Sequence, residues 1–338
     1  MAHIEKYFKN NNNLNTEDLL DKLSSDFKIT QNDSVFMLKY LLKMNSKDFI
    51  RKTRGIIIDK DTYKIISYPL EGKISLEKFK EKNKWDDTVI EESIDGTLIN
   101  MYYYNDKWNY STNSTLNAKC HWTSKETFKE LFLDTLKLYN FNINRLNKNY
   151  TYSFILCHPK TRNVSIYKTP KIYHILSRNL DTYKEVSLNL NIPKPKILKL
   201  DNLNSIQCNS YEDLFKYCSK LDFNKEGIML YSKNRQYRTK IKGKNHIKVR
   251  NIRGNHSNII YTILECNRFN SNNKTHTFLK YYPEFKDTYN NTIEKLNVLG
   301  KELLHEYTEI KKLKNKQFQH SYKYKKAIKE LHAQYIYL

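Results

Sequence analysis

Cysteine is scarce in this sequence, and its positions form no pattern. The five cysteines are scattered, odd in number and without the close paired spacing of a zinc site, so we expect them to be reduced. The ten histidines include no helical pair around a glutamate, and His121, His158 and His246 are expected to be structural. The sequence therefore predicts no metal site.

Long apolar runs are missing as well. No segment approaches the roughly 20 apolar residues that span a bilayer, and residues 1–6 (MAHIEK) lack a secretory hydrophobic region. We expect a soluble, cytoplasmic protein without membrane contact. At 338 residues, the chain is long enough to bury the core of one large domain and a smaller one.

Positive charge, by contrast, is abundant. Lysine and arginine total 59 against 36 aspartates and glutamates, which gives a formal net charge of +23. Nucleic acid is the polyanion that fits such a chain, whereas AT-rich codon usage alone would not explain the shortage of acidic residues. The 27 tyrosines add faces that stack on bases, as in residues 322–326 (YKYKK), although half-buried packing is the commoner use of tyrosine.

Hydrophobic periodicity predicts a mixed α+β chain. Helices are expected from residue 16 and over 33–44, 123–139 and 211–221, then in the charged stretches 288–315 and 317–337. Hairpins are expected over 56–68, 97–112 and 227–241, with further strands at 150–156, 164–167, 172–177 and 186–188. We expect antiparallel sheets in a domain over 1–256 and an all-helical domain over 257–338.

Four segments follow one another in a specific order. They are residues 53–56 (TRGI) with 68–73 (YPLEGK), residues 93–99 (SIDGTLI), residues 152–159 (YSFILCHP) with 162–167 (RNVSIY), and residues 226–230 (EGIML) with 240–242 (KIK). Together they resemble the signature blocks of the RNA-ligase branch of the covalent nucleotidyltransferases, a superfamily that also holds DNA ligases and mRNA capping enzymes. The resemblance covers about residues 50–250 and implies a nucleotidyltransferase fold.

Two departures from these blocks concern the chemistry that the resemblance implies. In the family, a lysine amine attacks the α-phosphate of ATP and forms a phosphoramidate that later delivers AMP to a 5′-phosphate end. Ser93 stands in place of that lysine, and a serine hydroxyl has a far higher pKa than a desolvated amine. Ile155 stands in place of the glutamate that organises the metal. The sequence therefore favours a protein without ligase activity.

The resemblance also implies which functions survive. The residues expected to contact phosphates or ribose are Arg54, Asp95, Glu226, Lys240 and Lys242. The residues expected to bind RNA are Arg238, Lys244, Lys248, Arg250, Arg253, Lys323, Lys325 and Lys326. The alternatives are that Asp95 only forms a turn and that the lysines of strand 240–242 are a solvated face. No cofactor is expected, although residual binding of ATP or Mg²⁺ remains open.

Three functions follow from these features. The first is an inactive, ligase-like RNA-binding protein that recognises tRNA or its cleaved ends. Such a protein, encoded on an AT-rich plasmid or viral genome, would serve as an immunity factor against an RNA-cleaving toxin. The second is an active ATP-dependent RNA ligase with another nucleophile, such as Lys73. The third is a protein that neutralises a toxin by binding it directly.

Overall fold

The computed structural model describes residues 16–41, 51–199, 208–267, 272–312 and 326–327. The chain divides into two compact units, residues 1–257 and residues 258–338. The helix expected over 317–337 lies outside the described residues apart from 326–327, and so do Lys323 and Lys325, whereas Lys326 is described and exposed. No helix in the described part has the length and apolar character needed to cross a membrane.

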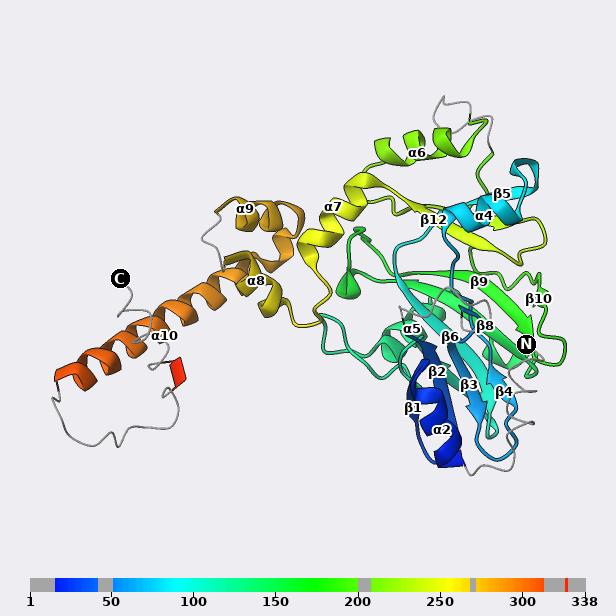
Figure 1. Cartoon of the computed structure of the whole chain (residues 1–338), viewed down its shortest axis with the longest axis horizontal. Helices are drawn as coiled ribbons and strands as arrows, with labels where there is room; N and C mark the ends of the chain where they lie inside the picture. Colours follow the sequence, from blue (N-terminus) through cyan, green and yellow to red (C-terminus); the bar gives the residue numbers. More distant parts are fainter. Residues whose placement is uncertain (1–15, 42–50, 200–207, 268–271, 313–325, 328–338) are drawn as a thin grey trace. The chain divides into compact units, whose positions relative to one another are not determined.

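The first unit contains three antiparallel sheets (Figure 1). The four-stranded sheet has the order β1 (Phe27–Gln31), β2 (Val35–Tyr40), β3 (Arg54–Asp59) and β4 (Ile65–Ser67). The five-stranded sheet has the order β10 (Glu185–Val186), β9 (Lys171–Asn179), β8 (Tyr150–Cys157), β6 (Thr97–Tyr104) and β7 (Lys107–Ser111). The three-stranded sheet has the order β12 (Arg238–Lys242), β11 (Gly227–Ser232) and β5 (Thr88–Ser93).

Each sheet buries one apolar face under helices. The helices of this unit are α2 (Thr16–Ser24), α4 (Leu76–Lys82), α5 (Phe128–Lys137), α6 (Tyr211–Lys220) and α7 (Lys244–Arg253), with short 3-10 turns at Trp85–Asp87, Ile143–Arg145 and Pro159–Thr161. Helix α2 shares a core with the four-stranded sheet, α5 with the five-stranded sheet, and α4 and α6 with the three-stranded sheet. The start of α5 is fixed by a capping box between Thr127 and Glu130.

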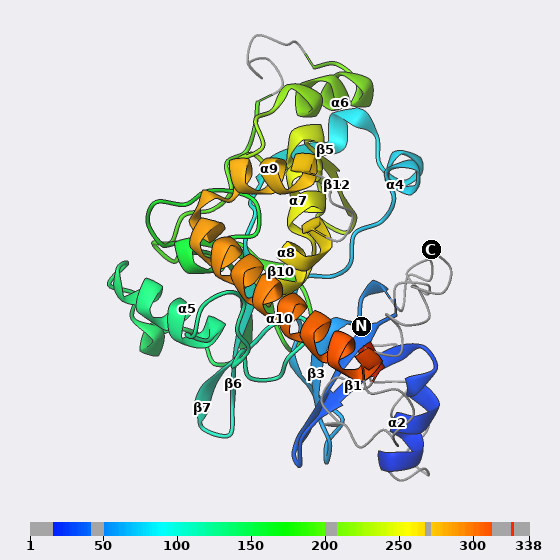
Figure 2. The same ribbon diagram turned by 90° about the vertical axis from the view of Figure 1, so that its left-hand side faces the viewer.

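The described part of the second unit is helical. It comprises α8 (Ile259–Asn267), α9 (Asn272–Tyr281), a 3-10 turn at Pro283–Phe285, and α10 (Lys286–Lys312), the long helix that Figure 2 shows along its length. Stacked rings join the end of α9 to the following turn, with the centroids of Phe278 and Tyr282 5.4 Å apart. The predicted α+β class with antiparallel sheets and C-terminal helices is confirmed.

Two predicted elements are wrong. Residues 35–40 of the expected helix 33–44 form strand β2, which pairs with β1 on one side and β3 on the other. The four consecutive buried residues from Val35 to Leu38 suit a strand covered on both faces, and periodicity alone does not separate such a run from a buried helix. Residues 164–167 form a loop instead of a strand, because the backbone N–H groups of Val164 and Ser165 donate to Asp95 and that of Ile166 donates to Asn224.

Candidate ligase-like site

The three-stranded sheet brings the second and fourth sequence blocks to one point. Strand β11 lies between β5 and β12, and Gly227 faces Ser93 on one side and Lys242 on the other. Lys240 and Lys242 alternate along β12, so both side chains lie on the same face of the sheet. The register therefore places Ser93, Glu226 and the two lysines around a single position, as the sequence blocks implied.

Gly227 is required for this arrangement. Its φ of +135° lies in a region that side-chain-bearing residues rarely adopt. A Cβ atom at this position would lie 2.1 Å from the carbonyl oxygen of Ile241 and 2.9 Å from Cα of Lys242. Glycine therefore permits the close approach of β12 that carries its lysines to Glu226.

Glu226 is the centre of the polar contacts. Its Oε2 accepts hydrogen bonds from Ser93 Oγ at 2.7 Å and from Lys240 Nζ at 2.8 Å, while Lys242 Nζ lies 3.3 Å from Oε1. Burial alone would raise the pKa of Glu226, but the two ammonium groups outweigh it and lower the pKa to about 2. Glu226 is therefore an anion throughout the physiological pH range.

Among the described residues, the Ser93 hydroxyl contacts a weak base, the Glu226 carboxylate. Ser93 is 4% exposed, and its hydroxyl donates to Glu226. A carboxylate with a pKa near 2 is a very weak proton acceptor, so it cannot generate a serine alkoxide. The contact fixes the orientation of the hydroxyl without making it a nucleophile.

Asp95 and Ile155 meet at the turn between β5 and β6. Asp95 Oδ2 accepts hydrogen bonds from the backbone N–H groups of Val164 and Ser165 at 3.1 and 2.8 Å. A Cβ atom on Gly96 would lie 2.6 Å from Cγ2 of Ile155, so the isoleucine packs directly against this turn. Asp95 holds the 164–165 loop in place, and Ile155 supplies apolar surface where the family pattern has a carboxylate.

A cavity of about 540 Å³ opens over these groups. Its cationic lining residues are Arg54, Lys73, Arg238, Lys240, Lys242 and Arg250, and its acidic ones are Glu91, Glu92, Asp95 and Glu226. All five residues that we expected to contact phosphate or ribose line this cavity. Although Lys73 is an exposed residue, partial burial of its ammonium group and the charges of Lys240 and Lys242 lower its pKa.

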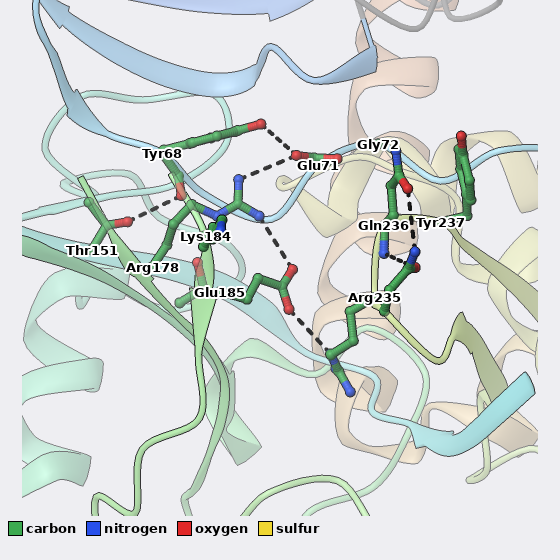
Figure 3. A network of polar contacts seen from close by, with 12 residues as sticks. Tyr68, Glu71, Gly72, Thr151, Arg178, Lys184, Glu185, Arg235, Gln236 and Tyr237 are labelled. Atoms are coloured by element: carbon green, nitrogen blue, oxygen red, sulfur yellow. Dashed lines mark hydrogen bonds and ion pairs between the residues drawn. The ribbon is translucent and has the colours of Figure 1, made fainter. Parts of the chain in front are cut away.

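A chain of ion pairs borders the cavity (Figure 3). Glu71 binds Arg178, Arg178 binds Glu185, and Glu185 binds Arg235, with nitrogen–oxygen distances of 3.3, 3.3 and 3.2 Å. Arg235 also lies 2.8 Å from Glu91 of β5. These pairs connect the five-stranded sheet to the three-stranded one and neutralise Glu91, which lines the cavity.

The predicted RNA-binding residues fall into two groups. Lys244, Lys248 and Arg250 are exposed on α7. Arg238 is only 6% exposed and lines the cavity, whereas Arg253 is fully buried, lies over the Trp122 ring at 5.1 Å and donates to the carbonyl of His256. The structure therefore separates the surface cations on α7 from two buried arginines, of which Arg238 lines the cavity and Arg253 contacts the segment after α7.

Sequence reasoning missed two parts of the site. One is the pair of backbone N–H groups at 164–165, which belonged to a predicted strand. The other is His246, which lies with Asp95 and Glu226 although we expected only a structural role for it. Spacing gave no signal, because these three residues are far apart in the sequence.

The chain is similar in sequence to two viral proteins. No protein-family model matches the chain. It is 25% identical over 263 residues, 72% of its length, to the "Putative bifunctional polynucleotide kinase/RNA ligase" of Autographa californica nuclear polyhedrosis virus. It is 26% identical over 286 residues, 79% of its length, to the "Immediate-early protein ICP-46 homolog" of Invertebrate iridescent virus 3. These matches span 37% and 62% of the two relatives.

Solved ligase structures overlap the chain in part. A structure described as "Putative ATP-dependent DNA ligase from Aquifex aeolicus" has a TM-score of 0.48 and 15% identity, with 81% of this chain and 80% of that chain covered. The Naegleria gruberi RNA ligase with PPi has a TM-score of 0.40 and 11% identity, with 54% of this chain and 59% of that chain covered. The sequence similarity to the viral polynucleotide kinase/RNA ligase confirms the RNA-ligase-like relationship predicted from the four blocks.

Proposed function

We propose that this chain is a catalytically inactive ligase-like protein that binds RNA. The observation that carries the proposal is the contact between Ser93 and Glu226. A hydroxyl replaces the reactive amine, and its partner is a carboxylate whose pKa lies near 2. Neither group supplies a nucleophile for the α-phosphate of ATP.

The basic charge of the chain supports RNA as the ligand. The net charge of +23, the cations around the cavity and the exposed Lys244, Lys248 and Arg250 form a surface for phosphates. In this proposal residues 1–256 are the ligase-like domain, residues 257–338 are a helical domain that adds RNA contacts, and the ligand is tRNA or its cleaved ends. Bound in this way, the protein would shield RNA broken by a toxin, which is the role of an immunity factor.

The test of inactivity is incubation with α-labelled ATP and Mg²⁺ or Mn²⁺, followed by denaturing electrophoresis. We expect no labelled protein, because the carboxylate that Ser93 contacts is a weak base and no amine occupies its position. An authentic ATP-dependent RNA ligase in a parallel reaction shows that an adduct survives the procedure. Label retained on this chain would overturn the proposal.

An active ligase with Lys73 as nucleophile is the second candidate. Lys73 lines the same cavity, and its lowered pKa increases the fraction of neutral, nucleophilic amine. This candidate requires a covalent adduct in the wild-type chain that disappears in Lys73→Met and persists in Lys137→Met, a change of an exposed lysine on α5. An adduct unaffected by Lys73→Met would eliminate it.

RNA binding should depend on salt through the α7 cations. Each lysine that contacts a phosphate contributes about one unit to the slope of log affinity against log salt concentration. We expect Lys244→Gln/Lys248→Gln to reduce the slope for total tRNA by about one to two units in a gel-shift titration. Lys137→Gln, which removes an exposed charge from α5, is the matched control and should leave the slope unchanged. An unchanged salt slope in the double variant would show that Lys244 and Lys248 do not contact RNA phosphates.

A further inference from the structure

Three aromatic side chains lie side by side across neighbouring strands of the five-stranded sheet. Trp108 of β7 pairs with Tyr103 of β6, and their ring centroids lie 5.3 Å apart. Strand β6 pairs with β8 as far as Met101 and Tyr152, and the same register continued by two residues brings Tyr103 beside Tyr150. All three side chains are half-buried. We call Trp108, Tyr103 and Tyr150 the aromatic row.

The aromatic row is separate from the ligase-like cavity. Side chains alternate along β6, so Tyr103 lies on the same face as Met101, which belongs to the core shared with α5. Leu98, which lines the cavity, lies on the opposite face and near the opposite end of β6. Trp108 and Tyr150 pack against the α5 core with part of their surface. The row therefore lies at the margin of this core and has no part in the cavity.

The polar groups of the aromatic row are available to a ligand. Its two hydroxyls and its indole N–H make no hydrogen bond to any residue that the structure describes. Two neighbouring tyrosines differ, because the hydroxyl of Tyr104 donates to Asp59 at 2.6 Å and that of Tyr152 donates to the carbonyl of Asn147 at 3.1 Å. Buried tyrosines usually bind their hydroxyls to protein groups in this way. The row instead presents its polar groups and part of each ring outward.

A lysine lies over one ring of the row. Lys148, two residues before β8, is exposed, and its Nζ lies 4.4 Å from the centroid of the Tyr103 ring. It makes no ion pair with any other residue in the described part of the chain. The contact shows that a group from outside the sheet can reach this face of the ring. If a base takes that place, the displaced ammonium can bind the phosphate of the same nucleotide.

We propose that the aromatic row binds single-stranded RNA by stacking its unpaired bases. Aromatic side chains on neighbouring strands stack successive bases in sheet-based RNA-binding domains, and such stacking tolerates any base sequence. The inference rests on the RNA binding proposed above. It adds a class of ligand, an unpaired segment of RNA, and a second contact surface on the face of the five-stranded sheet that carries α5.

The direct test is the affinity of the full chain for fluorescein-labelled decauridylate, an RNA without base pairs, measured by fluorescence anisotropy. Tyr103→Leu/Tyr150→Leu keeps apolar side chains on the sheet and removes two stacking rings. We expect the affinity to fall by at least about tenfold, with no change in its salt dependence because no charge is removed. Tyr237→Leu is the matched control, since Tyr237 is also half-buried beneath a lysine, with Lys82 Nζ 5.3 Å from its ring, but belongs to the three-stranded sheet. It should leave the affinity unchanged.

A second measurement needs no variant. Irradiation of the wild-type chain with decauridylate that carries 5-iodouridine should cross-link the RNA to the aromatic row, and mass spectrometry of the digested adduct identifies the residue. The inference would be overturned by cross-links that form only elsewhere, by absence of decauridylate binding, or by equal weakening in Tyr237→Leu and the double variant. If total tRNA still binds in these cases, only the aromatic row is refuted. If neither RNA binds, the proposed function fails with it.

Discussion

Replacing Gly227 with alanine is expected to lower the free energy of unfolding of the first unit by at least about 3 kcal/mol. A methyl group at this position would lie 2.1 Å from the Ile241 carbonyl oxygen, so β12 would have to move away from β11. Strain from the φ of +135° adds to this clash. Because the displaced strand carries Lys240 and Lys242, the contacts to Glu226 should loosen with it.

Urea denaturation followed by tryptophan fluorescence measures this effect. Trp85, Trp108 and Trp122 are the three tryptophans of the chain and all lie in the first unit, so the signal reports that unit. Gly300→Ala is the matched control: no heavy atom lies within 4 Å of its added Cβ, and alanine favours a helix interior by up to about 1 kcal/mol. If the urea midpoint of Gly227→Ala equals that of the control, the predicted clash and backbone strain at residue 227 do not destabilise the first unit.

Replacing Glu226 with glutamine should produce a loss of stability that depends on pH. The folded-state pKa of Glu226 is about 2, below the ordinary value of 4.5, which corresponds to about 3 kcal/mol of stabilisation at neutral pH. Because the folded pKa is depressed, this stabilisation is present above pH 4.5 and is lost as the pH falls toward 2. The wild-type chain should therefore exceed Glu226→Gln by about 3 kcal/mol at neutral pH, and the difference should shrink by about 2 kcal/mol near pH 3.

Paired urea titrations across this pH range test the prediction, since carboxylates common to both chains cancel in the difference. Glu92→Gln is the control, because Glu92 also lines the cavity but pairs with a largely exposed lysine, Lys225, at 2.7 Å. Glu92→Gln should lower the free energy of unfolding by no more than about 1 kcal/mol. A stability difference for Glu226→Gln that does not change with pH would show that the two lysines do not depress the pKa of Glu226.

Local sequence signals predicted the hairpins and the helices α2, α5, α6 and α10, but not α4 or α7. The pairs β3–β4, β6–β7 and β11–β12 each join strands that are neighbours in the chain, with alternating side chains and short turns. Helices α2, α5 and α6 lie within or close to the predicted ranges and bury apolar side chains on one face. The ligase-like blocks identified the cavity-lining residues because the family pattern keeps them in order along the chain.

Other features could not be predicted because they depend on tertiary contacts. Strand β2 resembles a helix in composition and is specified by its two neighbouring strands. The loop at 164–165 gives up strand pairing to donate two backbone hydrogen bonds to Asp95. His246 gave no sequence signal, since its hydrogen-bond partner among the described residues is a backbone carbonyl and the carboxylates near it come from other elements.

The central position of β11 also has a consequence for how the chain folds during synthesis. Ser93 and Glu226 are 133 residues apart, so β5 is made long before the strand that pairs with it. Contacts of such long range form late, after the entropy of closing the intervening loop has been lost. Until Gly227–Ser232 leaves the ribosome, this edge of β5 lacks its native partner and is open to pairing with other chains. The hydrogen bond between Ser93 and Glu226 therefore forms only late in folding. A nascent chain arrested before that point exposes the unpaired edge of β5, which can aggregate with other chains.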